Sequence, residues 1–400
     1  MKKLTQVLLL FSILFCTTQI KSQENYMESI QKTIQEVREK YAPDKRVALF
    51  NIELKEENEV LSLEGETNLP EAKSELNALL RKQGVQVKDN VETLPNEEFE
   101  KKCYGIVNVS VASIRSNPRH SAELATQALL GAVVNVYKKD GGFYLVQTPD
   151  MYISWADNDG IYLVTEDEKD EWINSKRVIY LKEYGFTYSK PDLNSDRVSD
   201  IVIGDILKFS KADSQFCEVK YPDGKTAYIP VSECTDLDEW ADSQNPTQES
   251  VLAMAKRFNG VPYMWGGTSS KLLDCSGFTK TVYFMHGIIL DRDASQQVHK
   301  GELVDTENGY ENLKKGDLLF FGRKAEGDKK ERITHVGIYI EDGDFIHEGG
   351  TVKINSFNKE KPYYSEYRTN TFIRARRVLS SIGENGIHTI RQNKFYYGEK

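Results

Sequence analysis

The spacing of apolar residues predicts a small mixed domain near the start of the chain. Apolar residues recur at helical spacing over 30–41 and 71–82, and they alternate with polar residues over 47–54, 60–64 and 85–91. The first spacing is typical of a helix with one buried face, and the second of a strand with one buried face. We therefore expect the element order αββαβ within residues 23–100.

The next region, from about residue 104 to 236, has the pattern of β-rich domains. Short runs of β-branched and aromatic residues are separated by turn signals, such as those at 139–142 and 222–224. Similar runs recur after about 70 residues, which indicates a duplication. We expect two small all-β barrels, over 101–168 and 169–240, followed by a polar linker.

The last domain, expected over 245–380 as an α+β fold, holds a cysteine in a distinctive setting. Cys275 precedes an apolar run, 279–285, that is compatible with a helix. A thiol at a helix N-terminus has a lowered pKa, because the unpaired amides and the helix dipole stabilise the thiolate. Asp274 opposes this effect by its charge, so we expect it to cap the helix or to contact a cation.

A nucleophilic thiol needs an imidazole that takes its proton, and two of the six histidines stand in a suitable context. If 341–343 forms a three-residue hairpin loop with Gly343 in the left-handed conformation, His335 and His347 lie on one face of the hairpin, about 7–8 Å apart. A two-residue turn would place them on opposite faces. The pattern predicts Cys275 as nucleophile, His335 as base and then acid, and His347 as the group that orients the imidazole.

Composition and charge narrow the class of partner. The chain has 400 residues, of which 39% are hydrophobic and 10% aromatic, and this excludes a largely disordered chain. Its 52 basic and 61 acidic residues give a net charge of −9, the wrong sign for binding nucleic acid through phosphates. We expect no metal or other cofactor, because no carboxylate or further cysteine lies at metal-ligand spacing. Cys217 and Cys234 flank a predicted hairpin and are either a disulfide or two buried thiols.

The first residues have the pattern of a secretory signal. Two lysines precede the apolar run 7–16, and small and polar residues follow it. The run is too short to span a bilayer, and no later segment has the length that a membrane helix needs. We expect a signal peptide over 1–22 and an exported chain in the periplasm or cell envelope. The bulky Phe15 disfavours a lipid anchor at Cys16.

Four motifs, in this order, resemble the NlpC family of papain-like cell-wall cysteine peptidases. They are Asp-Cys-Ser-Gly at 274–277, Lys-Gly-Asp-Leu-Leu-Phe-Phe at 315–321, His-Val-Gly-Ile-Tyr at 335–339 and Phe-Ile-His at 345–347. The predicted barrels resemble a tandem pair of bacterial SH3 domains. With the signal, this narrows the resemblance to γ-D-glutamyl-L-diamino acid endopeptidases, similar to dipeptidyl-peptidase VI, which cut the stem peptide of peptidoglycan. The αββαβ unit resembles a BON-type domain on pattern alone.

The resemblance implies substrate contacts around the nucleophile. In that subgroup a tyrosine lies near the nucleophile and the scissile carbonyl with a tryptophan beside it, which implies Tyr263 and Trp265 here. The acid before the nucleophile and the serine after it bind the free amino end of L-Ala, which implies Asp274 and Ser276. Ser295 matches a pocket serine of the family.

The first predicted barrel supplies the remaining contacts that the resemblance implies. Glu123 lies in a segment similar to the one whose glutamate also contacts the amine, and Tyr152 is a second candidate. Together they would block the cleft at the second subsite. A muropeptide with a free N-terminal L-Ala would fit, and a glycan-linked peptide would not.

The expected activity is hydrolysis of the γ-D-Glu to diamino acid bond through an acyl-enzyme on Cys275. One alternative is an amidase of the same cysteine and histidine class that acts on glycan-linked peptide. Another is a non-catalytic scaffold in which the SH3-like barrels bind the cell wall and the peptidase domain is inactive. Two segments stay open: 324–332 is a lid or a solvated loop, and the tail 381–400 matches no family.

Overall fold

The computed structural model divides the chain into two compact units, Met1–Glu98 and Phe99–Lys400. It describes residues 26–58, 60–99 and 101–399. The predicted signal segment, 1–22, lies outside the described residues. Within the described ranges, no helix combines the length and the apolar character needed to cross a membrane.

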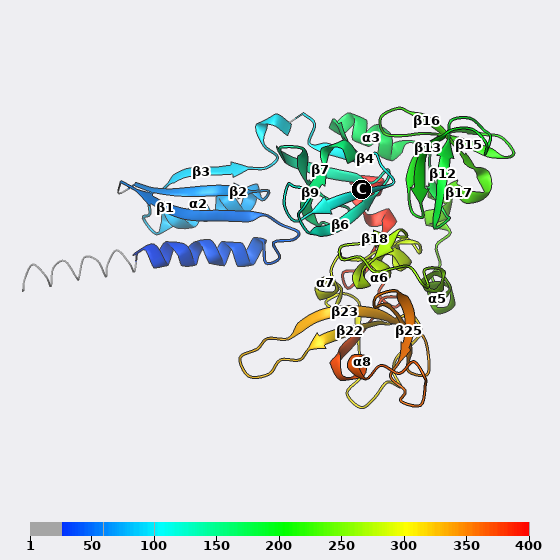
Figure 1. Cartoon of the computed structure of the whole chain (residues 1–400). Helices are drawn as coiled ribbons and strands as arrows, with labels where there is room; N and C mark the ends of the chain where they lie inside the picture. Colours follow the sequence, from blue (N-terminus) through cyan, green and yellow to red (C-terminus); the bar gives the residue numbers. More distant parts are fainter. Residues whose placement is uncertain (1–25, 59, 100, 400) are drawn as a thin grey trace, which may run out of the picture. The chain divides into compact units, whose positions relative to one another are not determined.

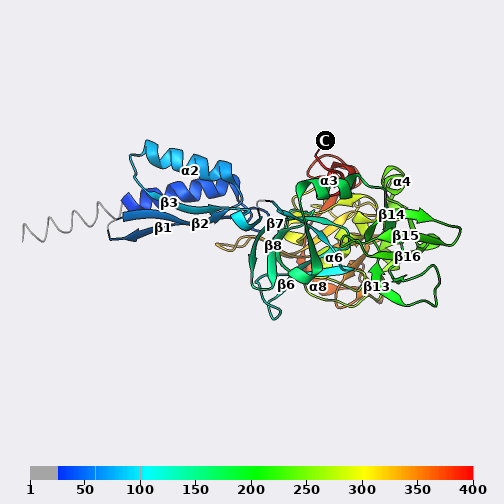
Figure 2. The same ribbon diagram turned by 90° about the horizontal axis from the view of Figure 1, so that it is seen from above.

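The first unit is a three-stranded sheet packed against two helices. A helix over 26–41 is followed by β1 (Phe50–Glu57), β2 (Val60–Thr67), α2 (Pro70–Lys82) and β3 (Lys88–Thr93). The strands lie in the order β1-β2-β3, with β2 and β3 parallel, and both helices lie beside the sheet (Figure 2). Apolar residues of both helices and of one sheet face form a single core. The order of elements is the predicted one.

The second unit begins with a seven-stranded antiparallel sheet. Its strands are β4 (Tyr104–Val107), β5 (Val111–Arg115), β6 (Leu124–Leu129), β7 (Val133–Asp140), β8 (Phe143–Gln147), β9 (Ile153–Asp157) and β10 (Ile161–Val164). They are arranged in the order β10-β4-β7-β8-β9-β5-β6. The helix α3 (Glu166–Asn174) follows, and Thr165 and Glu168 cap its first turn reciprocally.

A second seven-stranded sheet repeats this arrangement. Its strands are β11 (Arg177–Tyr180), β12 (Tyr184–Tyr188), β13 (Arg197–Val202), β14 (Ile206–Ala212), β15 (Phe216–Lys220), β16 (Thr226–Pro230) and β17 (Cys234–Asp236). They lie in the order β13-β12-β16-β15-β14-β11-β17, and α4 (Leu237–Asp242) follows. Cys217 and Cys234 are buried in this sheet's own core as free thiols.

The remaining residues form a six-stranded sheet with helices. The sheet contains β21 (Glu302–Val304), β26 (Phe372–Arg377), β22 (Leu318–Arg323), β23 (Arg332–Tyr339), β24 (Asp344–Glu348) and β25 (Val352–Ser356), in that spatial order. Two short pairs are β18 (Thr268–Ser269) with β19 (Leu272–Leu273) and β20 (Ile288–Ile289) with β27 (His388–Thr389). The helices are α5 (Gln248–Arg257), α6 (Cys275–Phe284), α7 (Ala294–Gln297), α8 (Glu366–Thr371) and α9 (Lys394–Tyr397).

The helix α6 lies at the centre of the second unit. It packs against β23 and β24 of the six-stranded sheet, and Figure 1 shows it between that sheet and the first seven-stranded sheet. One continuous hydrophobic core includes residues of the first seven-stranded sheet, of α6 and of the six-stranded sheet. The residue that begins α6 is therefore held where these layers meet.

The hairpin of β23 and β24 has the predicted register. Ile338 pairs with Ile346 and Tyr339 with Phe345, which leaves a three-residue loop over 341–343. Gly343 is left-handed with φ 81°, as the loop requires. The two histidines of the hairpin therefore lie on the same face, and the two-residue turn is excluded.

Candidate active site

Cys275 is the first residue of α6, and local chemistry fixes the start of this helix. The side chain of Asp274 accepts a hydrogen bond from the Gly277 amide at 2.7 Å, which caps the helix. A Cβ on Gly277 would lie 1.9 Å from the carbonyl oxygen of Gly267, so only glycine allows the helix to approach this loop. The thiol is thus held at a rigid helix end.

The thiol of Cys275 is buried and protonated at rest. Burial and the charge of Asp274 raise its pKa to about 12, although the backbone amides of Val336 and Ser276 act in the opposite direction. The prediction of a lowered pKa is therefore wrong for the free protein, because desolvation outweighs the helix amides, which do act in the predicted direction. A thiol in this state needs a base that takes its proton during attack.

The two predicted histidines are joined by a hydrogen bond. Nε2 of His335, on β23, lies 2.8 Å from Nδ1 of His347, on β24. Nε2 of His347 lies 2.8 Å from Oδ1 of Asn355, on β25, while the Asn355 amide nitrogen donates to the carbonyl of Tyr363. Three neighbouring strands thus carry one chain of hydrogen bonds.

This chain of hydrogen bonds sets the tautomers. The Asn355 amide already donates to a carbonyl, so its oxygen must accept from Nε2–H of His347. His347 Nδ1 then accepts from Nε2–H of His335, which leaves Nδ1 of His335 unprotonated. That nitrogen is available as a base for the thiol, which lies beside the backbone of Val336, the next residue on β23.

Both imidazoles are neutral over the physiological range. Burial, the charge of Arg368 and His347 lower the pKa of His335 well below 6.5. Burial lowers the pKa of His347 to about 4, although its hydrogen bond to Asn355 raises it. The resting state therefore combines a neutral thiol with two neutral imidazoles.

A cleft of about 470 Å³ opens at Cys275. Every predicted substrate contact lines it, and these residues are Glu123, Tyr152, Tyr263, Trp265, Asp274, Ser276 and Ser295. Trp265 is 62% exposed and Tyr263 38% exposed, so two aromatic faces are available to a ligand. The structure thus brings residues of four separate stretches of the sequence into one cleft.

The floor of the cleft contains a buried ion pair that the sequence did not indicate. Arg292, 1% exposed, donates from both terminal nitrogens to Asp274, at 2.5 and 3.2 Å, and also to Ser276 at 3.0 Å. Both expectations for Asp274 are correct, since it caps a helix and contacts a cation. Arg292 holds both oxygens of the carboxylate and offsets part of the effect of its charge on the thiol.

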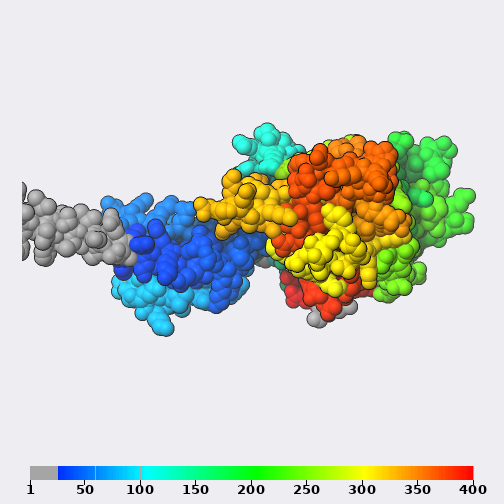
Figure 3. Space-filling view, turned by 90° about the horizontal axis from the view of Figure 1, so that it is seen from below, coloured from blue at the N-terminus to red at the C-terminus, as the bar shows by residue number. Residues whose placement is uncertain are grey.

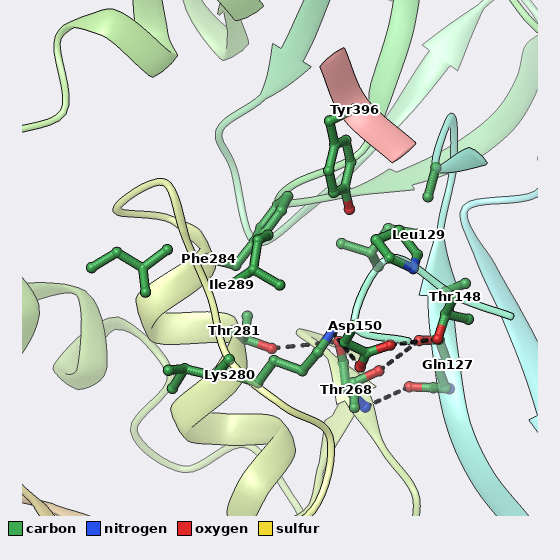
Figure 4. Close-up of a pocket in the computed structure, with 15 residues that line it drawn as sticks. Gln127, Leu129, Thr148, Asp150, Thr268, Lys280, Thr281, Phe284, Ile289 and Tyr396 are labelled. Atoms are coloured by element: carbon green, nitrogen blue, oxygen red, sulfur yellow. Dashed lines mark hydrogen bonds and ion pairs between the residues drawn. The ribbon is translucent and has the colours of Figure 1, made fainter. Parts of the chain in front are cut away.

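One part of the cleft lining comes from the first seven-stranded sheet and its loops. Thr268 donates to Gln127 through both its amide and its hydroxyl, at 2.9 and 3.0 Å, which joins β18 to β6. Lys280 on α6 forms an ion pair with the buried Asp150 at 3.2 Å. The pair lies beside a small cavity that residues of α6 and of the first seven-stranded sheet line together (Figure 4). These contacts hold Glu123 at a fixed place in the cleft.

Several residues of the site were absent from the sequence-based prediction, including two arginines and an asparagine. Arg292 and Arg332 line the cleft, and Asn355 completes the histidine chain. Asn355 could have been found, because the pairing of β24 with β25 places it two positions diagonally from His347. Nothing in the local sequence distinguishes Arg292 or Arg332 from surface arginines.

Comparison with known proteins identifies two parts of the chain. The NlpC/P60 family matches residues 260–377, and the bacterial dipeptidyl-peptidase Sh3 domain matches residues 114–161. These ranges contain Cys275, both histidines and Glu123. The prediction of a cell-wall cysteine peptidase fused to an SH3-like domain is confirmed.

Relatives are known that match more than half of this chain. The chain is 33% identical to a γ-D-glutamyl-L-lysine dipeptidyl-peptidase of Bacillus cereus, over 56% of this chain and 67% of the relative. It is 24% identical to dipeptidyl-peptidase 6 of Lysinibacillus sphaericus, over 65% and 94% respectively. A crystal structure of an NlpC/P60 family protein from Bacillus cereus superposes with a TM-score of 0.59 at 27% identity, covering 69% of this chain and 99% of that one. The chain belongs to the NlpC/P60 family of cysteine peptidases.

Proposed function

We propose that this peptidase hydrolyses the bond between γ-D-Glu and the diamino acid in peptidoglycan stem peptides that have a free N-terminal L-Ala. The observation that carries the proposal is that Glu123 and Tyr152, from a different domain, line the same cleft as Cys275. A carboxylate in this cleft suits an ammonium group, which a stem peptide with a free N-terminus has and a glycan-linked one lacks. Two relatives named γ-D-glutamyl-L-lysine dipeptidyl-peptidase support the same bond.

The proposed reaction follows from the neutral resting state. Nδ1 of His335 takes the thiol proton as Cys275 sulfur attacks the γ-carbonyl carbon, and His347 orients the imidazole. The Cys275 amide and Tyr263 stabilise the oxyanion. Collapse breaks the C–N bond, and His335 gives its proton to the leaving amine of the diamino acid. Water, deprotonated by His335, then hydrolyses the thioester and releases L-Ala-D-Glu.

The other cleft residues bind substrate in this proposal. Asp274, Ser276 and Glu123 bind the amino end of L-Ala, and Tyr152 completes that subsite. Trp265 forms the wall beside Tyr263, and Ser295 contacts the peptide from α7. Export to the periplasm or cell envelope is part of the proposal, supported by the leader-like pattern of residues 1–22.

The test compares two peptides and two proteins. Wild type and Cys275→Ala are incubated with L-Ala-γ-D-Glu-L-Lys and with its N-acetyl derivative, and the products are measured by mass spectrometry. Release of L-Ala-D-Glu by wild type from the free peptide alone is the expected result. Cleavage of the acetylated peptide would instead indicate the amidase, and identical results for wild type and Cys275→Ala would indicate a non-catalytic scaffold.

A further inference from the structure

The active-site cleft contains a positive charge that the proposed reaction does not use. Arg332, at the start of β23, lines the cleft together with Ile333 and Thr334. Its side chain is exposed, and among the residues that the structure describes its guanidinium has no carboxylate partner. The preceding Glu331 forms an ion pair with Arg374 at 2.5 Å, so it does not neutralise Arg332.

The position of Arg332 is fixed by the fold. The pairing of β22 with β23 shifts by one residue between Phe321 and Gly322, which leaves Thr334 unpaired, and Arg332 lies two residues before this bulge, opposite Arg323. A Cβ on Gly322 would lie 1.9 Å from the Arg332 carbonyl oxygen, so the two backbones are in close contact. The tip of the hairpin projects from the surface in Figure 3, whereas Arg332 belongs to its paired base.

The charges that line the cleft are arranged for a zwitterion. Asp274 and Arg292 neutralise each other. Glu123, on the wall from the first seven-stranded sheet, has an exposed carboxylate without a cation partner in the described residues. Besides Asp293, the N-cap residue of α7, the cleft therefore offers one carboxylate on that wall and one guanidinium on β23. A ligand with an ammonium group and a carboxylate complements both.

The proposed substrate carries both an ammonium group and a carboxylate, and both lie on the part of the peptide that occupies this cleft. Its ammonium group is on L-Ala, and its scissile carbonyl must lie at Cys275. The α-carboxylate of D-Glu is the only other charge between these two points. Arg332 shares the cleft with the amino-end residues and with Ser295 on α7, which packs against β23, so it faces this part of the peptide.

We propose that Arg332 binds the α-carboxylate of D-Glu and makes the peptidase prefer stem peptides in which this carboxylate is free over those in which it is amidated. The inference rests on the proposed function and adds a specificity determinant to it. A guanidinium gives a carboxylate two parallel hydrogen bonds, whereas a carboxamide accepts only one and has no charge.

The test crosses one residue change with one substrate change. kcat/KM is measured for wild type, Arg332→Gln and Arg332→Lys with L-Ala-γ-D-Glu-L-Lys and with the same peptide carrying an α-carboxamide. A charged hydrogen bond that is partly exposed to water predicts an acid-over-amide preference of about tenfold in wild type. Arg332→Gln should lower kcat/KM for the acid by about tenfold and leave the amide within about twofold. Arg332→Lys should keep most of the preference.

A matched control is Lys330→Gln, which removes an exposed positive charge from the same hairpin outside the cleft lining and should behave as wild type. If Arg332→Gln affects both peptides equally, or neither, the inference is overturned while the proposed function stands. If wild type cleaves neither peptide, the proposed function itself fails. The two failures are therefore distinguishable.

Discussion

The side-chain amide of Asn355 influences the thiol of Cys275 indirectly, through the imidazoles of His347 and His335. Its oxygen accepts from His347 Nε2, and this one contact determines which nitrogen of His335 is free to take a proton. Without it, His347 is free to protonate at Nδ1, and the hydrogen bond from His335 is then lost. Asn355 is thus a positioning residue that touches no reacting atom.

Replacing Asn355 with leucine should lower kcat by about tenfold while KM changes little, because a mispositioned imidazole costs about one hydrogen bond in the transition state. Asn355→Asp, which still accepts from His347 Nε2, should retain more activity than Asn355→Leu. Steady-state kinetics on the free tripeptide measures both. An equal loss in KM and kcat for both variants would indicate general disruption of β25 instead.

The burial of His335 predicts how kcat/KM depends on pH. A base must be unprotonated, so kcat/KM falls as the pH falls through the pKa of His335, which lies well below 6.5. The charge of Arg368 contributes to this lowering, since it disfavours the imidazolium. Arg368→Met should therefore raise the pKa of His335 and move the acid limb to higher pH.

The check for Arg368 is a kcat/KM profile from pH 7 down to the lowest pH at which the protein stays folded, measured against Lys359→Met. Lys359 is an exposed lysine in the loop between β25 and α8, and its removal should leave the profile as in wild type. An acid limb that stays in place in Arg368→Met would show that desolvation alone sets the pKa of His335.

At the scale of elements, the loop that carries Trp265 touches the first seven-stranded sheet through a glycine. Gly266 has φ 81°, and a Cβ there would lie 2.3 Å from the carbonyl oxygen of Leu124, the residue after Glu123. The loop and the sheet approach each other this closely only because position 266 has no side chain. The cleft width between Trp265 and Glu123 depends on this contact.

Gly266→Ala should therefore raise KM for the free tripeptide and lower the Tm. The matched control is Gly260→Ala, which has φ 87° but nothing within 4 Å of its Cβ. The control carries only the strain of a left-handed residue, about 1–2 kcal/mol. Equal effects of the two variants on KM would mean that the contact with Leu124 does not shape the cleft.

Elements whose signals are local could be predicted from the sequence, and contacts between distant segments could not. The hairpin register followed from the loop length and from Gly343, and Cys275 at a helix start followed from its flanking residues. The bulge beside Gly322 and the pairing of Arg292 with Asp274 depend on how separate segments pack. The lowered thiol pKa was predicted wrongly because burial cannot be judged from helix position alone.

At the scale of the whole second unit, the segment from residue 388 onward connects parts that are far apart in the sequence. Asn393 donates to the carbonyl of Pro149, in the loop between β8 and β9 of the first seven-stranded sheet, at 2.7 Å. Arg177, at the start of the second one, donates to the carbonyl of Tyr396 at 2.8 Å, and the Tyr396 ring packs on Phe284 of α6. A segment without a recognisable motif thus contacts both sheets and the helix that carries the thiol.

Deleting residues 388–400 should lower the Tm and raise KM more than it lowers kcat. Three buried side chains, Ile390, Phe395 and Tyr396, are lost with the segment, and each contributes about 1.5–3 kcal/mol of burial. The reacting groups all lie outside it, but Glu123 reaches the cleft only while the first sheet stays docked on α6. Calorimetry and steady-state kinetics should therefore change together, whereas removal of residues 399–400 alone should alter neither. A lowered Tm with an unchanged KM would mean that β6, β18 and the Lys280–Asp150 ion pair hold the cleft without the tail.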